Sequence, residues 1–85
     1  MKYVVFRQKN LFIPVIIPEC ATHCHVRILN AKPVSAGFFT IQNGEVLISN
    51  LSSESLNLGP DKLRDIKLLT DLLNNSGMYA FVSYD

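Results

Sequence analysis

The stretch that decides the fold runs from Val34 to Ser49 and reads VSAGFFTIQ-NG-EVLIS. Two runs rich in β-branched and aromatic residues flank the pair Asn43-Gly44, which suits a type I′ turn because both central residues of that turn need a positive φ. The stretch therefore predicts an antiparallel hairpin. Gly37 lies inside its first strand, where a glycine lowers stability unless it marks a bulge or a close backbone approach. We expect this position to tolerate alanine poorly.

A second hairpin is predicted upstream of this stretch. The runs from Lys2 to Gln8 and from Leu11 to Ile17 are rich in strand-forming residues, and a short polar segment separates them. Pro14 lies inside the second run and has no N–H to donate to a ladder. We therefore expect that strand at an edge of the sheet, or broken by a bulge at Pro14.

A short helix is predicted between the two hairpins. Thr22 is a suitable N-cap, and Val26 and Leu29 follow it at a spacing of one helical turn. We expect this helix to run from His23 to Leu29 and to end near Asn30.

A longer helix is predicted from the opening Gly59-Pro60-Asp61 to about Asn74, with Gly77 as its left-handed cap. Its apolar residues recur at helical spacing and are expected to face the sheet: Leu63, Ile66, Leu69, Leu72 and Leu73. Its polar residues are expected on the solvent side: Arg64, Asp65, Lys67 and Asp71.

The element order is strand, strand, helix, strand, strand, helix, strand, with a Ser- and Asn-rich loop at residues 50–59 and a last strand from Tyr79 to Tyr84. Segregated hairpins and amphipathic helices favour the α+β class, with one antiparallel sheet of four to five strands covered by two helices on one face. A chain of 85 residues is expected to form a single domain, 1–85.

The composition restricts the cellular locations that we expect for this protein. The longest apolar run, Leu11 to Pro18, is far shorter than the roughly 20 residues of a membrane-spanning helix. Cys20 and Cys24 lie too close together to close a long loop, so we expect two reduced thiols. These features predict a cytoplasmic protein without a membrane partner.

Cys20, His23, Cys24 and His25 form the only dense cluster of soft metal ligands in the sequence. On a helix the first three share a face, but a structural zinc site needs four ligands and the chain has no other Cys or His. A Cys–His pair also resembles a thiol nucleophile with its base, yet no motif supplies an oxyanion site. We expect no catalytic residue, metal or cofactor, and keep a metal- or thiol-dependent enzyme at this cluster as the second alternative.

Basic residues concentrate in residues 1–32, where Glu19 is the only acid: Lys2, Arg7, Lys9, Arg27 and Lys32. Cations that gather on one surface would fit a phosphate backbone, although the formal net charge of +1 is low for that role. A nucleic-acid-binding accessory protein is therefore the first alternative, and ordinary solvated charge is the simplest interpretation.

The low charge content favours association with a protein. Charged residues make up 18% of the chain, against roughly 25% in soluble domains. Phe38 and Phe39 are adjacent and must point to opposite faces of a strand, so one of them lies under a helix on the second face or is exposed as a contact residue. Tyr3, Arg7 and Lys9 on the first hairpin are the other candidate interaction residues.

The segments Pro14 to Glu19, His23 to Val26 and Pro33 to Phe38 resemble those of small bacterial and prophage-encoded proteins that begin with Met-Lys-Tyr and carry a Val-Ser-Ala-Gly-Phe strand. Ser52 to Gly59 matches their Ser-rich piece before a terminal acidic helix, whereas the extension through Tyr79 to Asp85 departs from their pattern. The resemblance implies a bacterial or phage origin and no known activity, so no site residue is carried over.

The sequence as a whole predicts a small non-enzymatic protein of the bacterial cytoplasm that acts through protein–protein interaction. Its expected partner is a second copy, as a homodimer, or a host protein that it binds or inhibits.

Overall fold

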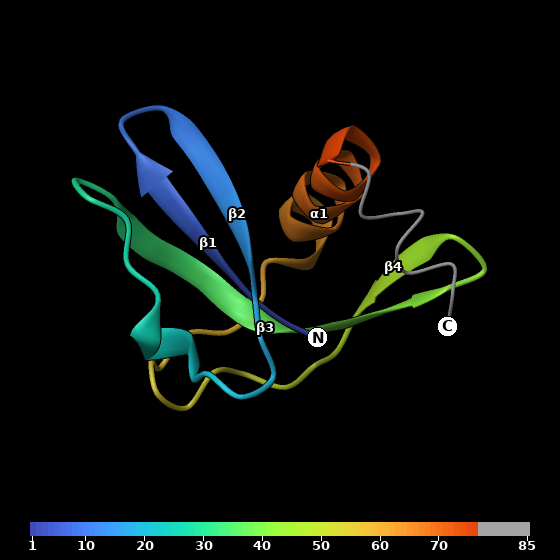
Figure 1. Cartoon of the computed structure of the whole chain (residues 1–85), viewed down its shortest axis with the longest axis horizontal. Helices are drawn as coiled ribbons and strands as arrows, with labels where there is room; N and C mark the ends of the chain where they lie inside the picture. Colours follow the sequence, from blue (N-terminus) through green and yellow to red (C-terminus); the bar gives the residue numbers. More distant parts are fainter. Residues whose placement is uncertain (77–85) are drawn as a thin grey trace.

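A computed structural model describes residues 1–76 of the chain. Four strands form one antiparallel sheet in the order β2-β1-β3-β4, and one α-helix packs on a face of it (Figure 1). The elements are β1 (Lys2–Gln8), β2 (Leu11–Ile17), the 3₁₀ turn η1 (His23–His25), β3 (Lys32–Gln42), β4 (Glu45–Ile48) and α1 (Lys62–Ser76). The α+β class and both predicted hairpins are confirmed. The predicted strand from Tyr79 to Tyr84 and the predicted cap Gly77 lie outside the described residues.

β1 is the central strand and is buried on both faces. Tyr3, Val4, Val5 and Phe6 are each at most 2% exposed. A strand that is paired on both sides and covered on both faces buries consecutive side chains, which is why its sequence is a continuous apolar run instead of an alternating one.

The two faces of the sheet are covered differently. On one face α1 packs over a core that contains Tyr3, Phe39, Val46 and Leu69. On the other face, residues 18–31 and 50–59 pack over a second core built on Val4, Phe6, Ile17 and Ala36. The sequence predicted helices on one face, and the structure has one helix there and irregular segments on the opposite face (Figure 1).

The Asn43-Gly44 turn has the predicted backbone, with φ of 52° at Asn43 and 80° at Gly44. At Gly37 a Cβ atom would lie 3.4 Å from the Leu51 carbonyl oxygen and 3.4 Å from the Tyr3 ring. The close approach that the glycine indicated is therefore real. Alanine nevertheless fits at van der Waals contact, contrary to expectation, and only larger side chains would clash.

The predicted helix from His23 to Leu29 is wrong beyond its first turn. Only η1 is helical, and Val26 already has an extended backbone, with φ of −98° and ψ of 132°. Val26 and Ile28 pack on the second core. The alternate residues, Arg27 and Leu29, are exposed. This alternation of period two is typical of an extended segment, and burial on the sheet overrides the helical spacing.

The orientation of α1 also differs from the prediction. Asp65, Leu69 and Leu73 face the sheet with at most 1% exposure, whereas Leu63 is 90% exposed. The helix is rotated from its most apolar stripe because the Asp65 carboxylate is bound by groups of β1 and β3. Asp65 was expected on the solvent side, and this placement is corrected.

Candidate functional site

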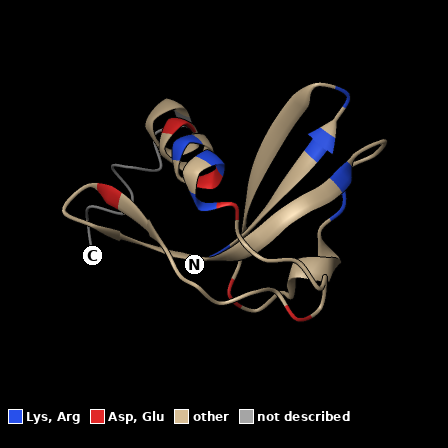
Figure 2. Cartoon of the chain, turned by 180° about the vertical axis from the view of Figure 1, so that it is seen from behind, with Lys and Arg blue, Asp and Glu red and all other residues tan. Residues whose placement is uncertain are grey.

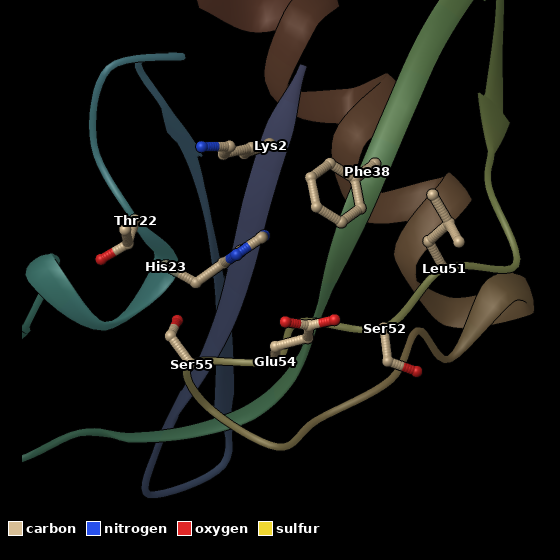
Figure 3. A pocket seen from close by; sticks show the side chains of 8 residues that line it. All are labelled: Lys2, Thr22, His23, Phe38, Leu51, Ser52, Glu54 and Ser55. Carbon is tan, nitrogen blue, oxygen red and sulfur yellow. The ribbon is translucent and has the colours of Figure 1, made fainter.

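An open hollow of about 580 Å³ lies between β1, β3, η1 and the 50–59 loop (Figure 3). Its lining combines two apolar side chains, Phe38 and Leu51, with six polar or charged ones: Lys2, Thr22, His23, Ser52, Glu54 and Ser55. The residues come from four separate segments, so the pocket lies where the irregular segments 18–31 and 50–59 meet the sheet.

His23 is the buried histidine of this pocket, at 4% exposure. Its Nε2 lies 2.9 Å from the Gly37 carbonyl oxygen, and its ring meets the Phe38 ring edge-on at 5.1 Å. The Lys2 ammonium donates to the carbonyl oxygens of Glu19 and Ala21, at 3.1 and 2.8 Å. These hydrogen bonds anchor residues 18–31 to the sheet and engage the Nε2 of His23 and two of the three N–H donors of Lys2.

The cysteine–histidine cluster does not converge. Cys20 is exposed, Cys24 is half-buried, and the Nδ1 of His25 accepts from the Thr22 backbone N–H at 3.4 Å. Within residues 1–76, no three His, Cys, Asp or Glu side chains are placed to hold a metal ion. The weak metal candidates Cys20, His23 and Cys24 are thus separated, because η1 is a single turn and not the helix that would align them.

Cys24 has a polar setting of its own. Its Sγ lies 3.3 Å from Thr22 Oγ1, and this hydrogen bond, with a weaker one from Ser55, lowers the pKa of the thiol. Cys24 also lines a second pocket of about 330 Å³, together with Arg27 and apolar residues such as Phe6 and Val26. A base is missing beside the thiol among the lining residues, so the geometry does not complete a nucleophilic site.

The most closely connected polar group is buried under the start of α1. The Asp65 carboxylate accepts from the Tyr3 hydroxyl at 2.7 Å, from the Ser35 hydroxyl at 3.0 Å and from the Asp61 backbone N–H at 2.9 Å. Arg64 donates to Asp65 at 3.3 Å and to the Ser35 hydroxyl at 2.9 Å. We call Tyr3, Ser35, Arg64 and Asp65 the helix-docking cluster, since it joins α1 to β1 and β3.

The helix-docking cluster shifts the pKa of the Tyr3 phenol. Its side chain is fully buried, and burial together with the hydrogen bond to the Asp65 carboxylate raises the pKa of the phenol well above its usual range. A neutral phenol that only donates to a carboxylate serves structure, and no cavity among those described reaches it.

The candidate interaction residues separate into two groups. Tyr3 and Phe39 lie in the core at 0% and 1% exposure, so they are not accessible to a partner. Phe38 is half-buried at the pocket, and Arg7 and Lys9 are exposed.

Four of the five N-terminal cations gather at one end of the sheet, where the β1–β2 turn lies beside the 26–31 loop (Figure 2). Arg7 and Lys32 are cross-strand partners, Lys9 follows in the turn, and Arg27 lies in the neighbouring loop. Lys2 lies at the opposite end of β1 and is not part of this group. We call the four cations, with the exposed Leu11 and Leu29, the basic end.

The two outer strands present their backbones differently. Met1 and Phe39 exchange two backbone hydrogen bonds, so by alternation Val5 bonds towards β3 and its β2 partner Pro14 turns its nitrogen to the free edge. The predicted edge position of Pro14 is confirmed. Proline removes the central donor of that edge, which limits strand addition there.

β4 forms the other edge and has no such protection. The Ser49 N–H donates to the Phe38 carbonyl at 2.9 Å, so by alternation the backbone groups of Val46 and Ile48 point outward. Among residues 1–76, no strand pairs with this side of β4. The Leu47 side chain of β4 is 41% exposed and lies on the face of the sheet opposite α1. Sequence reasoning missed Leu47, although period-two alternation with Val46 and Ile48 places it on that face.

Within the described residues, no helix is long and apolar enough to cross a membrane. Scans against family models, curated proteins and solved structures found no match to this chain.

Proposed function

We propose that this protein acts through protein–protein contact, and that the contact is self-association by pairing of β4 with β4 of a second copy. The observation that carries the proposal is the outward-facing backbone of Val46 and Ile48 at an edge without proline or lysine. Exposed strand edges of this kind are common docking surfaces.

An antiparallel pairing of two β4 strands is self-complementary. With the two-fold axis at Leu47, Val46 of each copy lies opposite Ile48 of the other, and these are the residues with free donors and acceptors. Leu47 then meets its own counterpart across the axis on one face. Glu45 falls opposite Ser49, so the register places no like charges face to face.

The whole molecule is compatible with such a contact. A formal net charge of +1 gives little repulsion between copies. The strand is only 4 residues long, so the buried area is small and we expect a dissociation constant on the order of micromolar or weaker.

The proposal includes no reaction. Its other parts rest on the sequence. We propose a cytoplasmic location on the composition and the two expected reduced thiols, and a host protein as the alternative partner on the bacterial or phage origin that the resemblance implies.

The test is a pair of charge variants measured by light scattering behind size exclusion over a range of concentrations. The wild type should shift from monomer to dimer as concentration rises. Leu47→Lys and Leu47→Glu should each stay monomeric, because like charges would face each other across the axis. An equimolar mixture of the two variants should recover the dimer mass.

Leu51→Lys is the matched control, because Leu51 is an exposed leucine at 64% outside β4. It should dimerise like the wild type. A wild type that stays monomeric up to millimolar concentration, or a dimer that survives both Leu47 variants, would overturn the β4 contact.

A further inference from the structure

The basic end combines cations with protruding aliphatic side chains, and we propose that it binds the surface of a membrane rich in anionic phospholipid. The sequence-based expectation of no membrane partner rested on the lack of a spanning segment. A peripheral contact needs none.

Among residues 1–76, no ion pair joins an acidic side chain to any of the four cations of this end. Arg7 and Lys32 lie side by side in the sheet, and Lys9 and Arg27 flank them in the two neighbouring loops. Glu19 is the only acidic residue before Glu45, and it pairs with the Met1 amino group at 3.4 Å, at the opposite end of β1. Figure 2 shows basic residues at the β1–β2 turn and on both sides of the tip of the 26–31 loop, and no acidic residue at either place. Such a cluster is attracted to an anionic leaflet.

Aliphatic side chains project from the same two tips. Leu29 is 83% exposed in the 26–31 loop and Leu11 is 64% exposed at the start of β2. Leucines flanked by Lys and Arg can enter the boundary between headgroups and acyl chains while the cations stay among the headgroups.

The two tips are held together. The Gln8 side-chain amide donates to the Leu29 carbonyl oxygen at 2.9 Å and so joins the β1–β2 turn to the 26–31 loop. Within the β1–β2 turn, the Arg7 Nε donates to the Lys9 carbonyl oxygen at 3.0 Å. A hollow of about 550 Å³ lies at the tips and is lined by Lys9, Leu11 and Asn30 among others. The end therefore presents both leucines together, with space between the tips for a phosphate headgroup.

A nucleic acid is the other polyanion that four cations fit, but the apolar groups here favour lipid. Leu11 and Leu29 offer no ring for stacking with a base. The nearby aromatic ring, Phe12, is 39% exposed, but the Arg64 guanidinium lies 4.7 Å from its centroid and occupies one face of the ring. The exposed leucines gain from an acyl boundary and gain nothing from a phosphate backbone.

The experiment is co-sedimentation of the full chain with vesicles of phosphatidylcholine alone or with about 30% phosphatidylserine. We expect binding only to the anionic vesicles and a decrease with added salt. Replacing Arg7, Lys9 and Lys32 by Gln should lower the partition coefficient roughly fivefold for each cation removed. Leu11→Ser and Leu29→Ser should lower it about tenfold each.

Matched controls are available elsewhere on the surface. Lys62→Gln with Lys67→Gln removes exposed cations of α1, and Leu51→Ser with Leu63→Ser removes leucines exposed at 64% and 90%. Both sets should leave the partition coefficient unchanged. The chain has no Trp, so Leu29→Trp supplies a reporter whose emission should shift to the blue on vesicles, whereas Leu63→Trp should not shift.

Binding equal for neutral and anionic vesicles, or loss with the α1 controls as large as with the basic end, would overturn the proposal. So would tighter binding to a single-stranded oligonucleotide that depends on the cations but not on the leucines. The Leu47 variants keep the basic end intact, so failure of β4 pairing and failure of lipid binding are distinguishable.

Discussion

Asp65 shows how a single residue sets the geometry of the fold. Its carboxylate is fully buried and accepts hydrogen bonds from β1, from β3 and from the start of its own helix. A buried charge is tolerated only when it is paired and hydrogen-bonded, so the helix must approach the sheet with Asp65 over Tyr3 and Ser35. This requirement turns Leu63 outward.

Asp65→Asn should destabilise the protein by about 3 kcal/mol, because an amide N–H₂ would replace an acceptor among four donors and leave Arg64 without its buried partner. Urea unfolding measures the effect. Asp71→Asn is the control, since Asp71 is an exposed acid of the same helix and should change stability by less than about 0.5 kcal/mol. Equal midpoints for the two variants would contradict the role of Asp65.

Tyr3 should make stability fall at alkaline pH. Its folded-state pKa is raised by burial and by Asp65, whereas the unfolded phenol ionises near pH 10, about its usual value. The contribution is therefore complete below about pH 10 and is lost as pH rises further, since only the unfolded state releases the proton. Denaturant midpoints of the wild type should drop more steeply above pH 10 than those of Tyr3→Phe. Parallel pH profiles would exclude this contribution.

At the scale of elements, the four strands within residues 1–76 were predictable and the orientation of α1 was not. Local signals suffice for the hairpins. Asn43-Gly44 specifies the turn between β3 and β4, and Pro14 indicates that β2 lies at an edge of the sheet. The stripe from Leu63 to Leu73 indicated a helix correctly but not its buried face, because the deciding contact joins Asp65 to residues more than 29 positions away. The helix expected after Thr22 failed for a similar reason, since the sheet binds Val26 and Ile28 in an extended segment.

Leu69 and Leu63 distinguish the two orientations of α1. Leu69→Ala should cost about 2–5 kcal/mol, because Leu69 is fully buried, whereas Leu63→Ala at 90% exposure should stay within about 0.5 kcal/mol. Both substitutions keep helix propensity high, so urea unfolding compares packing alone. A similar cost at both positions would instead support the orientation expected from the apolar stripe.

On the scale of the whole molecule, the two surfaces proposed for binding lie apart. β4 and the basic end occupy opposite sides of the sheet (Figure 1), which leaves each accessible while the other is engaged. The sequence predicted an associating protein from low charge and a marked edge, and Arg7 and Lys9 of the basic end were among its candidates. It did not predict β4 as an edge of the sheet that residues 1–76 form, because strand order depends on long-range pairing of β1 with β3.

Amide hydrogen exchange of Val46 and Ile48, followed as a function of protein concentration, tests the central claim most directly. Their N–H groups face outward from β4, so β4 pairing predicts fast exchange in dilute protein and slow exchange in concentrated protein, with Leu47→Lys remaining fast throughout. Exchange at these two residues that is independent of concentration, whether fast or slow, would contradict self-association through β4.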